Sequence, residues 1–91
     1  MRNYNDPVYE KVRSLVLKRD QRCCQMPNCK SKKKLHVHHI RPWSKAAYLR
    51  FEPSNLITLC RECHESIKDK EHIYESMFMS IVRENENNTR H

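Results

Sequence analysis

Two closely spaced cysteine pairs, separated by thirty residues, are the first feature of the sequence that could do chemistry. One pair is Cys24-x4-Cys29 and the other is Cys60-x2-Cys63. Two such knuckles can supply the four thiolates of a tetrahedral zinc ion without long-range strain, and the bound ion adds folding free energy. We therefore predict a structural zinc site with these four ligands: Cys24, Cys29, Cys60 and Cys63.

Three alternatives to this ligand set are open. Disulfides are disfavoured, because the cysteine count of five is odd and the N-terminus lacks the apolar stretch of a signal peptide. Cys23 is adjacent to Cys24 and could replace it in a Cys-x5-Cys knuckle, although we prefer the shorter spacing and leave Cys23 as a free thiol. His64 could also take the place of one cysteine.

Three histidines and one asparagine form a second group of candidate site residues: His38-His39, then Asn55, then His64. Adjacent side chains on a strand point to opposite faces, so one of the two adjacent histidines is expected to bind a metal and the other to react. His64 follows Cys63 on a predicted helix, about 100° around its axis. It can therefore turn towards His38 and form a second, more open metal site. His36 shares a strand face with His38 and is expected beside the site or facing DNA.

Four segments together resemble the cysteine-bearing HNH endonucleases. They are VLKRD (16–20), CQ (24–25), LHVHHIRPW (35–43) and NLITLCRECH (55–64). The gaps of fifteen and eight residues between His39, Asn55 and His64 suit that family, and the resemblance covers residues 12–68. Gln21, where the family often has glycine, and the widened first knuckle depart from the pattern.

The resemblance implies an α+β fold of the small ββα-metal, treble-clef-like kind, and a role for each matching residue. His38 and His64 resemble the ligands of one catalytic divalent metal, His39 the general base, and Asn55 the residue that holds the loop carrying the base. An imidazole has a pKa near neutrality and suits a base, while a cation would neutralise the scissile phosphate. Imidazole ligands favour Mn²⁺, Co²⁺, Ni²⁺ or Zn²⁺ over Mg²⁺, although a site with two imidazole ligands is also compatible with Mg²⁺.

The predicted activity is metal-dependent DNA cleavage with little sequence specificity, as nicks or double-strand breaks, leaving 5′-phosphate and 3′-hydroxyl ends as the family implies. Small phage members of the family imply DNA-packaging (terminase) proteins as partners. Either a monomer or a dimer is compatible with the sequence. The alternatives are a zinc-stapled nucleic-acid-binding module without activity, and a structural zinc protein that acts through protein contacts.

The N-terminal half must provide a helix and an ordered loop to position these residues. Asp6-Pro7 is a typical helix start, and the apolar spacing predicts a helix over residues 7–19. Its core-facing residues are expected to be Val8, Val12, Leu15 and Val16. Residues 20–34 lack apolar periodicity and are predicted to form a loop that the cysteines hold in place.

The remaining elements are two strands and two helices. Alternation predicts strands over 35–40, ended by Arg41-Pro42, and over 56–60. Helices are predicted over 62–69 and 71–83, followed by a frayed tail over 84–91. The last helix is expected to present Ile73, Met77 and Ile81, with Tyr74, Phe78 and Val82 beside them. The chain has no glycine, so turns are expected to use Asn, Asp, Ser and Pro.

Length and composition predict one small domain over residues 1–91 that needs an additional stabilising cross-link, such as a bound metal ion. The chain has 91 residues, 37% of them apolar, and a mean hydropathy of −0.97. Such a core alone does not outweigh the entropy of ordering the chain. No apolar run is long enough for a membrane span or a signal peptide, so we expect a soluble protein of the cytoplasm, or of the host cytoplasm if phage-encoded.

The charge is positive and uneven. The net charge is +7, with thirteen Lys and Arg against three Asp and Glu over residues 1–50, and five against eight over residues 51–91. A basic surface favours DNA as the partner through phosphate contacts. Arg41 is the best candidate for the scissile phosphate, since its guanidinium can pair two oxygens. The predicted DNA-binding lysines are Lys30, Lys32, Lys33, Lys34 and Lys45.

Overall fold

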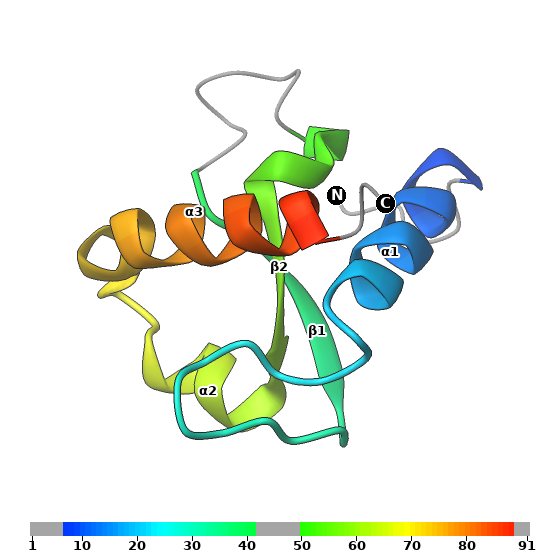
Figure 1. Ribbon diagram of the computed structural model, residues 1–91. Coiled ribbons are helices and arrows are strands. Elements are labelled where there is room, and N and C mark those ends of the chain that lie inside the picture. The colour runs from blue at the N-terminus through cyan, green and yellow to red at the C-terminus, as the bar shows by residue number, and fades with distance from the viewer. Residues whose placement is uncertain (1–6, 42–49, 89–91) are drawn as a thin grey trace.

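The computed structural model describes residues 7–41 and 50–88 of the chain, and Figure 1 shows how the elements are arranged. In chain order they are α1 (Pro7–Arg19), β1 (Leu35–His39), the 3-10 helix η3 (Pro53–Asn55), β2 (Leu56–Cys60), α2 (Arg61–Ser66) and α3 (Glu71–Asn88). The strands form a two-stranded antiparallel sheet, and α2 follows β2 directly. The predicted α+β fold with a ββα unit is therefore confirmed.

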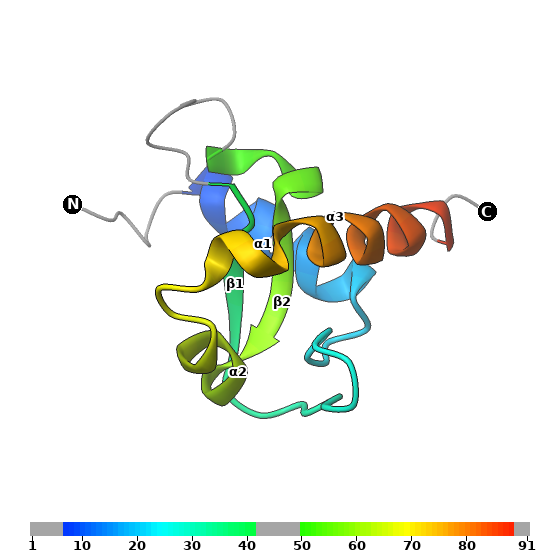
Figure 2. The ribbon, with the colours of Figure 1, turned by 90° about the vertical axis from the view of Figure 1, so that its left-hand side faces the viewer.

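Helices cover both faces of the sheet. On one face, Leu56 of β2 packs with Val12 and Val16 of α1. On the other face, Ile57 joins a core that includes Phe78 of α3, and α3 crosses the strands there (Figure 2). Burial on both faces explains why all five residues of β2 are apolar or small and buried.

The strand register decides which histidines face which helix. His36 lies opposite Leu59, and His38 lies opposite Ile57, so both histidines belong to the face covered by α3. His39 lies opposite Leu56, on the face covered by α1. Side chains alternate between the faces of a strand, and the register therefore separates His39 from the other two histidines.

The helix α1 has the predicted bounds, but its buried face differs from the expected one. Val12 and Val16 are buried as expected, whereas Val8 and Leu15 are about half exposed. Leu17 is buried in their place. The buried stripe of α1 is therefore rotated around the helix axis towards Leu17. The predicted capping residue of this helix, at position 6, lies outside the described residues.

The two later helices also differ from prediction at their ends. The helix α2 begins at Arg61 and ends at Ser66 rather than spanning 62–69. The helix α3 continues to Asn88, so the expectation of a frayed tail is wrong for residues 84–88. Asn85 explains the extension, since it donates hydrogen bonds to Asp20 and Gln25. Ile73, expected on the apolar face of this helix, is 64% exposed.

Left-handed backbone is frequent in a chain that has no glycine. Over residues 7–41 and 50–88, six positions have this conformation, and two of them carry the residue types expected in turns; the six are Gln21, Arg22, Asn28, Lys30, Lys34 and Asp69. At Gln21, φ is 60°, the conformation that glycine adopts without steric cost. Gln21 therefore adopts the backbone conformation that a glycine at this position would favour.

Among the described residues, no helix combines the length and the apolar content needed to cross a membrane.

Candidate functional site

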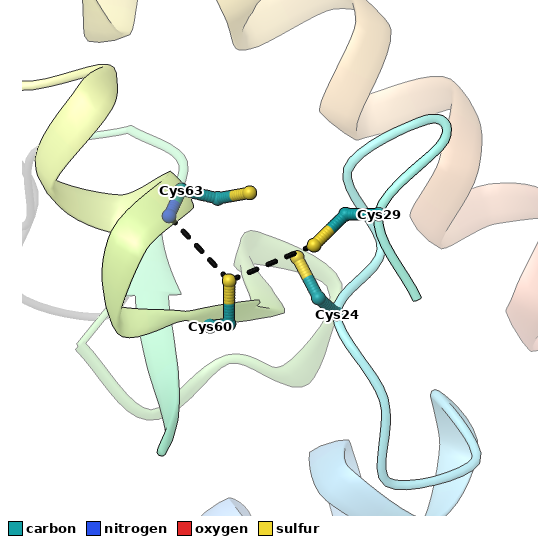
Figure 3. A group of neighbouring side chains, drawn as sticks. All are labelled: Cys24, Cys29, Cys60 and Cys63. Atoms are coloured by element: carbon teal, nitrogen blue, oxygen red, sulfur yellow. Dashed lines mark hydrogen bonds between the residues drawn. The ribbon is translucent and has the colours of Figure 1, made fainter. Parts of the chain in front are cut away.

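The four predicted cysteine ligands lie together at one end of the sheet (Figure 3). Their Sγ atoms are all within 4.8 Å of one another, and the Sγ atoms of Cys29 and Cys60 are 3.7 Å apart. Four sulfurs bound to one zinc ion at 2.3 Å lie about 3.8 Å apart in a regular tetrahedron. The cluster, made of Cys24, Cys29, Cys60 and Cys63, is therefore placed to bind a metal ion, and its donor set fits zinc.

Backbone hydrogen bonds form the two knuckles that carry these thiols. The amide of Cys24 donates to the carbonyl of Ser31 at 2.7 Å, which closes the loop between α1 and β1. Cys60 ends β2 and caps α2, and its Sγ accepts the amide of Cys63 at 3.5 Å. One cysteine pair thus comes from a closed loop and the other from a strand-to-helix junction.

The structure also distinguishes between the two adjacent cysteines. Cys24 belongs to the cluster, whereas the Sγ of Cys23 lies 3.4 Å from the carbonyl oxygen of Asp20. None of the five cysteines forms a disulfide. The preferred Cys-x4-Cys spacing therefore describes the first knuckle, and Cys23 packs inside the protein.

Burial and hydrogen bonding perturb the thiols in different directions. Burial raises the pKa of Cys24 and that of Cys63, so both groups hold their protons at neutral pH without a metal. The backbone amide of Ser31 lowers the pKa of Cys29. Metals bind the thiolate form, and metal uptake by the cluster therefore displaces protons.

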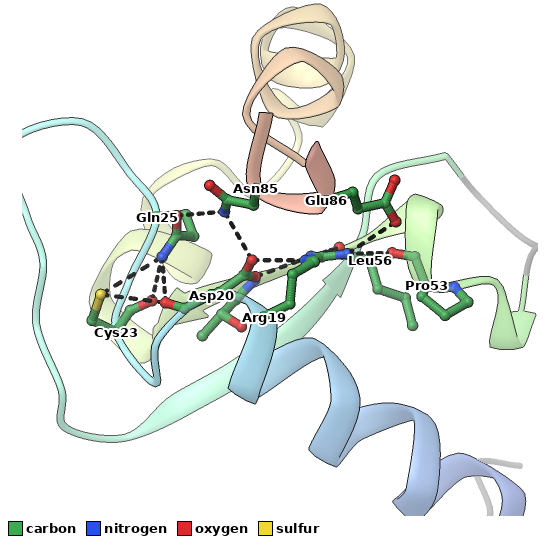
Figure 4. A network of polar contacts seen from close by, with 9 residues as sticks. Arg19, Asp20, Cys23, Gln25, Pro53, Leu56, Asn85 and Glu86 are labelled. Carbon is green, nitrogen blue, oxygen red and sulfur yellow. Dashed lines mark hydrogen bonds and ion pairs between the residues drawn. The ribbon is translucent and has the colours of Figure 1, made fainter. Parts of the chain in front are cut away.

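A buried polar network ties the first knuckle to the rest of the fold (Figure 4). The carboxylate of Asp20 accepts hydrogen bonds from the amide of Thr58 at 3.0 Å and from the side chain of Asn85 at 2.9 Å. It also pairs with Arg19 at 2.8 Å. Gln25, next to the first ligand, donates to the carbonyl of Asp20 at 2.8 Å. The network joins α1, β2 and α3 directly beside Cys24.

Sequence reasoning did not assign Gln25 or Asn85 to this network. The available signal was the Arg19-Asp20 pair at the end of a predicted helix, followed closely by Cys24-Gln25. A buried carboxylate needs several donors, because an unpaired buried charge is costly. Asn85 provides one of these donors from sixty-five positions beyond Asp20. No pattern in the sequence around Asn85 indicates this role.

His38 is buried on the face of β1 that α3 covers. Its ring centroid lies 5.2 Å from that of His64 and 5.8 Å from that of Phe78. Its Nε2 has no hydrogen-bond partner among the described residues. Burial, aided by the charge of His64, lowers the pKa of His38 to about 4. The ring is therefore neutral near pH 7, the form of imidazole that binds metals, and its buried nitrogen lacks the partner that a metal would supply.

His36 lies on the same strand face as His38 and reaches His64 from the solvent side. The Nδ1 atoms of His36 and His64 are 3.2 Å apart, and their rings meet nearly at right angles. His36 is exposed. The imidazoles of His36 and His38 therefore both lie against that of His64, although in the described part of the chain only the cysteines form a group of three or more mutually close metal donors.

His39 faces away from this group, towards the segment before η3. Its Nε2 lies 3.0 Å from the carbonyl oxygen of Arg50. A carbonyl accepts only, so in the neutral ring Nε2 carries the hydrogen and Nδ1 carries the lone pair. The contact thus leaves Nδ1 as the basic nitrogen.

Asn55 binds the chain just after β1. Its side-chain oxygen accepts the amide of Arg41 at 2.9 Å, and its side-chain nitrogen donates to the carbonyl of Arg41 at 3.0 Å. Its own carbonyl accepts the amide of Ile40 at 2.8 Å. Asn55 is almost fully buried. It therefore holds the segment that follows His39 to the start of β2.

The predicted DNA-contacting cations that the structure describes are all exposed to solvent. Arg41 is exposed and forms an ion pair with Glu75 of α3 at 3.4 Å. Lys33 and Lys34 line an open cavity of about 520 Å³ beside the cysteine cluster, together with Arg61. Lys30 and Lys32 are exposed on the same loop, and Lys45 lies outside the described residues.

Known protein families include one whose model matches this chain. No curated protein and no solved structure matches the chain. The family model described as HNH endonuclease matches residues 24–70, which include both cysteine pairs, the three clustered histidines, His39 and Asn55. This match covers more than half of the 91 residues, and the chain therefore belongs to the HNH endonuclease family.

Proposed function

We propose that this protein is a divalent-metal-dependent DNA endonuclease with a structural zinc ion at the four cysteines. The observation that carries the proposal is the buried, unpartnered Nε2 of His38 beside the ring of His64. A buried polar atom without a partner is costly, and metal ligation by His38 and His64 would remove that cost. Mn²⁺, Co²⁺, Ni²⁺, Zn²⁺ and Mg²⁺ are the candidate ions.

His39 is the proposed general base. The carbonyl of Arg50 holds the tautomer in which Nδ1 can accept a proton. Nδ1 would take a proton from water as the water oxygen attacks the phosphorus, while the 3′-oxygen leaves. The products would carry 5′-phosphate and 3′-hydroxyl ends.

Two other residues support this role for His39. Asn55 would act as a positioning residue, because it binds both backbone groups of Arg41 and so holds the chain that leaves the histidine strand. Arg41 would pair with the scissile phosphate through its guanidinium. When bound, the divalent cation would supply charge neutralisation at the phosphate and the leaving oxygen.

The lysine loop is the proposed DNA-binding surface. Lys30, Lys32, Lys33 and Lys34 are all exposed and follow the first zinc knuckle, and Lys45 is proposed by its place in the sequence alone. Contacts from lysines to phosphates add affinity without reading bases, so we propose cleavage with little sequence specificity. The family's phage members suggest DNA-packaging (terminase) proteins as partners.

The decisive test is the variant His39→Ala, assayed for nicking of supercoiled plasmid with each candidate metal. We expect the nicking rate to fall at least about 100-fold, the usual contribution of a general base. DNA affinity, measured by fluorescence anisotropy, should stay within about twofold, because phosphate contacts dominate it. His72→Ala, an exposed histidine of α3, is the matched control and should cleave as the wild type does.

Two results would contradict the proposal in different ways. Full nicking activity in His39→Ala would show that His39 is not the base. DNA binding by the wild-type protein without cleavage under any of the five metals would favour the alternative of a zinc-stapled nucleic-acid-binding module.

A further inference from the structure

His36 has no part in the proposed reaction, yet it is one of the two histidines that approach His64. The two Nδ1 atoms are 3.2 Å apart, while the rings are nearly perpendicular. His36 is exposed on β1, two residues before His38 and on the same face of the strand. Both histidines of this face therefore have ring contacts to the same residue of α2.

The distance between these two nitrogens is that of two ligands on one metal ion. Nitrogens bound at 2.0–2.1 Å lie about 3.0 Å apart at an octahedral right angle and about 3.4 Å apart in a tetrahedron. The observed 3.2 Å falls between these values. A hydrogen bond between two neutral imidazoles has a similar length, so distance alone fits both a ligand pair and a hydrogen-bonded pair.

The orphaned nitrogen of His38 favours a cation beside these rings, where the Nδ1 atoms of His36 and His64 already lie at a ligand-to-ligand distance. A hydrogen bond between His36 and His64 leaves the buried Nε2 of His38 without a partner among the described residues. A cation that draws the three rings together would satisfy this atom as well. The three rings do not yet form a closed donor group, and the exposed side chain of His36 can rotate towards the others at small cost.

We propose that His36 is a third imidazole ligand of the divalent cation held by His38 and His64, which rests on the metal site of the proposed function. Three imidazoles would make the site selective for Ni²⁺, Co²⁺ or Zn²⁺ over Mg²⁺. The metal would be bound on one side by the buried ring of His38 and on the other by an exposed, exchangeable ring. Its remaining positions would face solvent and substrate.

The test is a calorimetric titration with NiCl₂, in the absence of DNA, of protein that carries one equivalent of zinc for the cysteine cluster. In the variant His36→Gln, glutamine keeps a hydrogen-bonding group near His64 but removes the imidazole. We expect its Ni²⁺ affinity to fall on the order of tenfold or more. In the matched control His72→Gln, the affinity should stay within about twofold, and in His64→Gln the site should be lost. Circular dichroism with zinc analysis confirms that each variant is folded.

Unchanged Ni²⁺ affinity in His36→Gln would overturn the proposal and leave His36 as a hydrogen-bond partner of His64. Unchanged affinity in His64→Gln would overturn it too, because Ni²⁺ would then bind elsewhere. The visible spectrum of bound Co²⁺ is a second readout, and loss of a nitrogen ligand in His36→Gln should change its band positions. Since neither measurement involves cleavage, an inactive wild-type protein would contradict the proposed function without affecting this ligand assignment.

Discussion

The cysteine cluster and the histidine cluster lie at the same sheet, but their structures differ. The four thiols are already mutually close and come from two knuckles that backbone hydrogen bonds hold in place. The three histidines come from β1 and α2, and only His38 is buried. The cysteine cluster is thus the more closed of the two and the histidine cluster the more open, which is the difference expected between a structural and a catalytic metal site.

The support around the two clusters differs as well. The first cysteine knuckle contains Gln25, which is hydrogen-bonded to the carbonyl of Asp20 and to the side chain of Asn85 of α3. On the histidine side, Arg41 has an exposed ion pair with Glu75. Buried networks contribute more to stability than exposed ion pairs do, because solvent and salt screen the latter. Substitutions near the cysteines should therefore affect folding, and those near the histidines should affect binding.

The largest expected effect distinguishes the two adjacent cysteines. Cys24→Ser removes a ligand of the cluster, and we expect the variant to lose zinc and its folded circular dichroism spectrum at 25 °C, since structural zinc supplies on the order of 10 kcal/mol to small domains. Cys23→Ser is the control, because this thiol is hydrogen-bonded to Asp20 and Gln25 and lies outside the cluster. It should keep one zinc ion and lose no more than about 2 kcal/mol. A folded Cys24→Ser protein with zinc bound would contradict the assignment.

A smaller effect is expected for the network behind the cluster. Asp20→Asn leaves the largely buried guanidinium of Arg19 without its buried carboxylate partner, and we expect the free energy of unfolding to fall by about 3 kcal/mol. Urea unfolding of the zinc-loaded protein measures this change. Glu86→Gln alters the more exposed partner of Arg19, at 3.7 Å, and should cost less than about 1 kcal/mol. Equal losses in both variants would show that the buried network is not the stronger support.

The smallest expected effect belongs to the histidine side. Glu75→Gln releases Arg41 from its ion pair, and we expect DNA affinity at low salt to rise about two- to fivefold, in line with the strength of exposed pairs. Glu84→Gln changes the net charge equally on the same helix, at an exposed position, and is the matched control. Anisotropy titrations with the two variants should differ. An equal increase in both would mean that net charge, and not the release of Arg41, sets the affinity.

Much of the fold was predictable because local signals and tertiary packing agree. The helix over residues 7–19 has the predicted bounds, and the strand over residues 56–60 does too. The exposure of Leu15 and the extension of α3 to Asn88 were not predictable, since each depends on which surfaces meet. The apolar pattern of a helix shows that one face is buried, but a pattern several residues wide does not show where the edge of that face lies.

The sequence by itself determined the chemical types and their order: two cysteine pairs at metal-binding spacing, a histidine pair on a strand, and the segments that resemble the HNH endonucleases. Short spacings of this kind can be interpreted from the sequence alone, because residues close in the chain are also close in space. Only the tertiary structure decided between Cys23 and Cys24, brought Asn85 to Asp20, and placed His36 at 3.2 Å from His64. Those outcomes depend on how the sheet register and the helices bring distant residues together, and no local pattern encodes such distances.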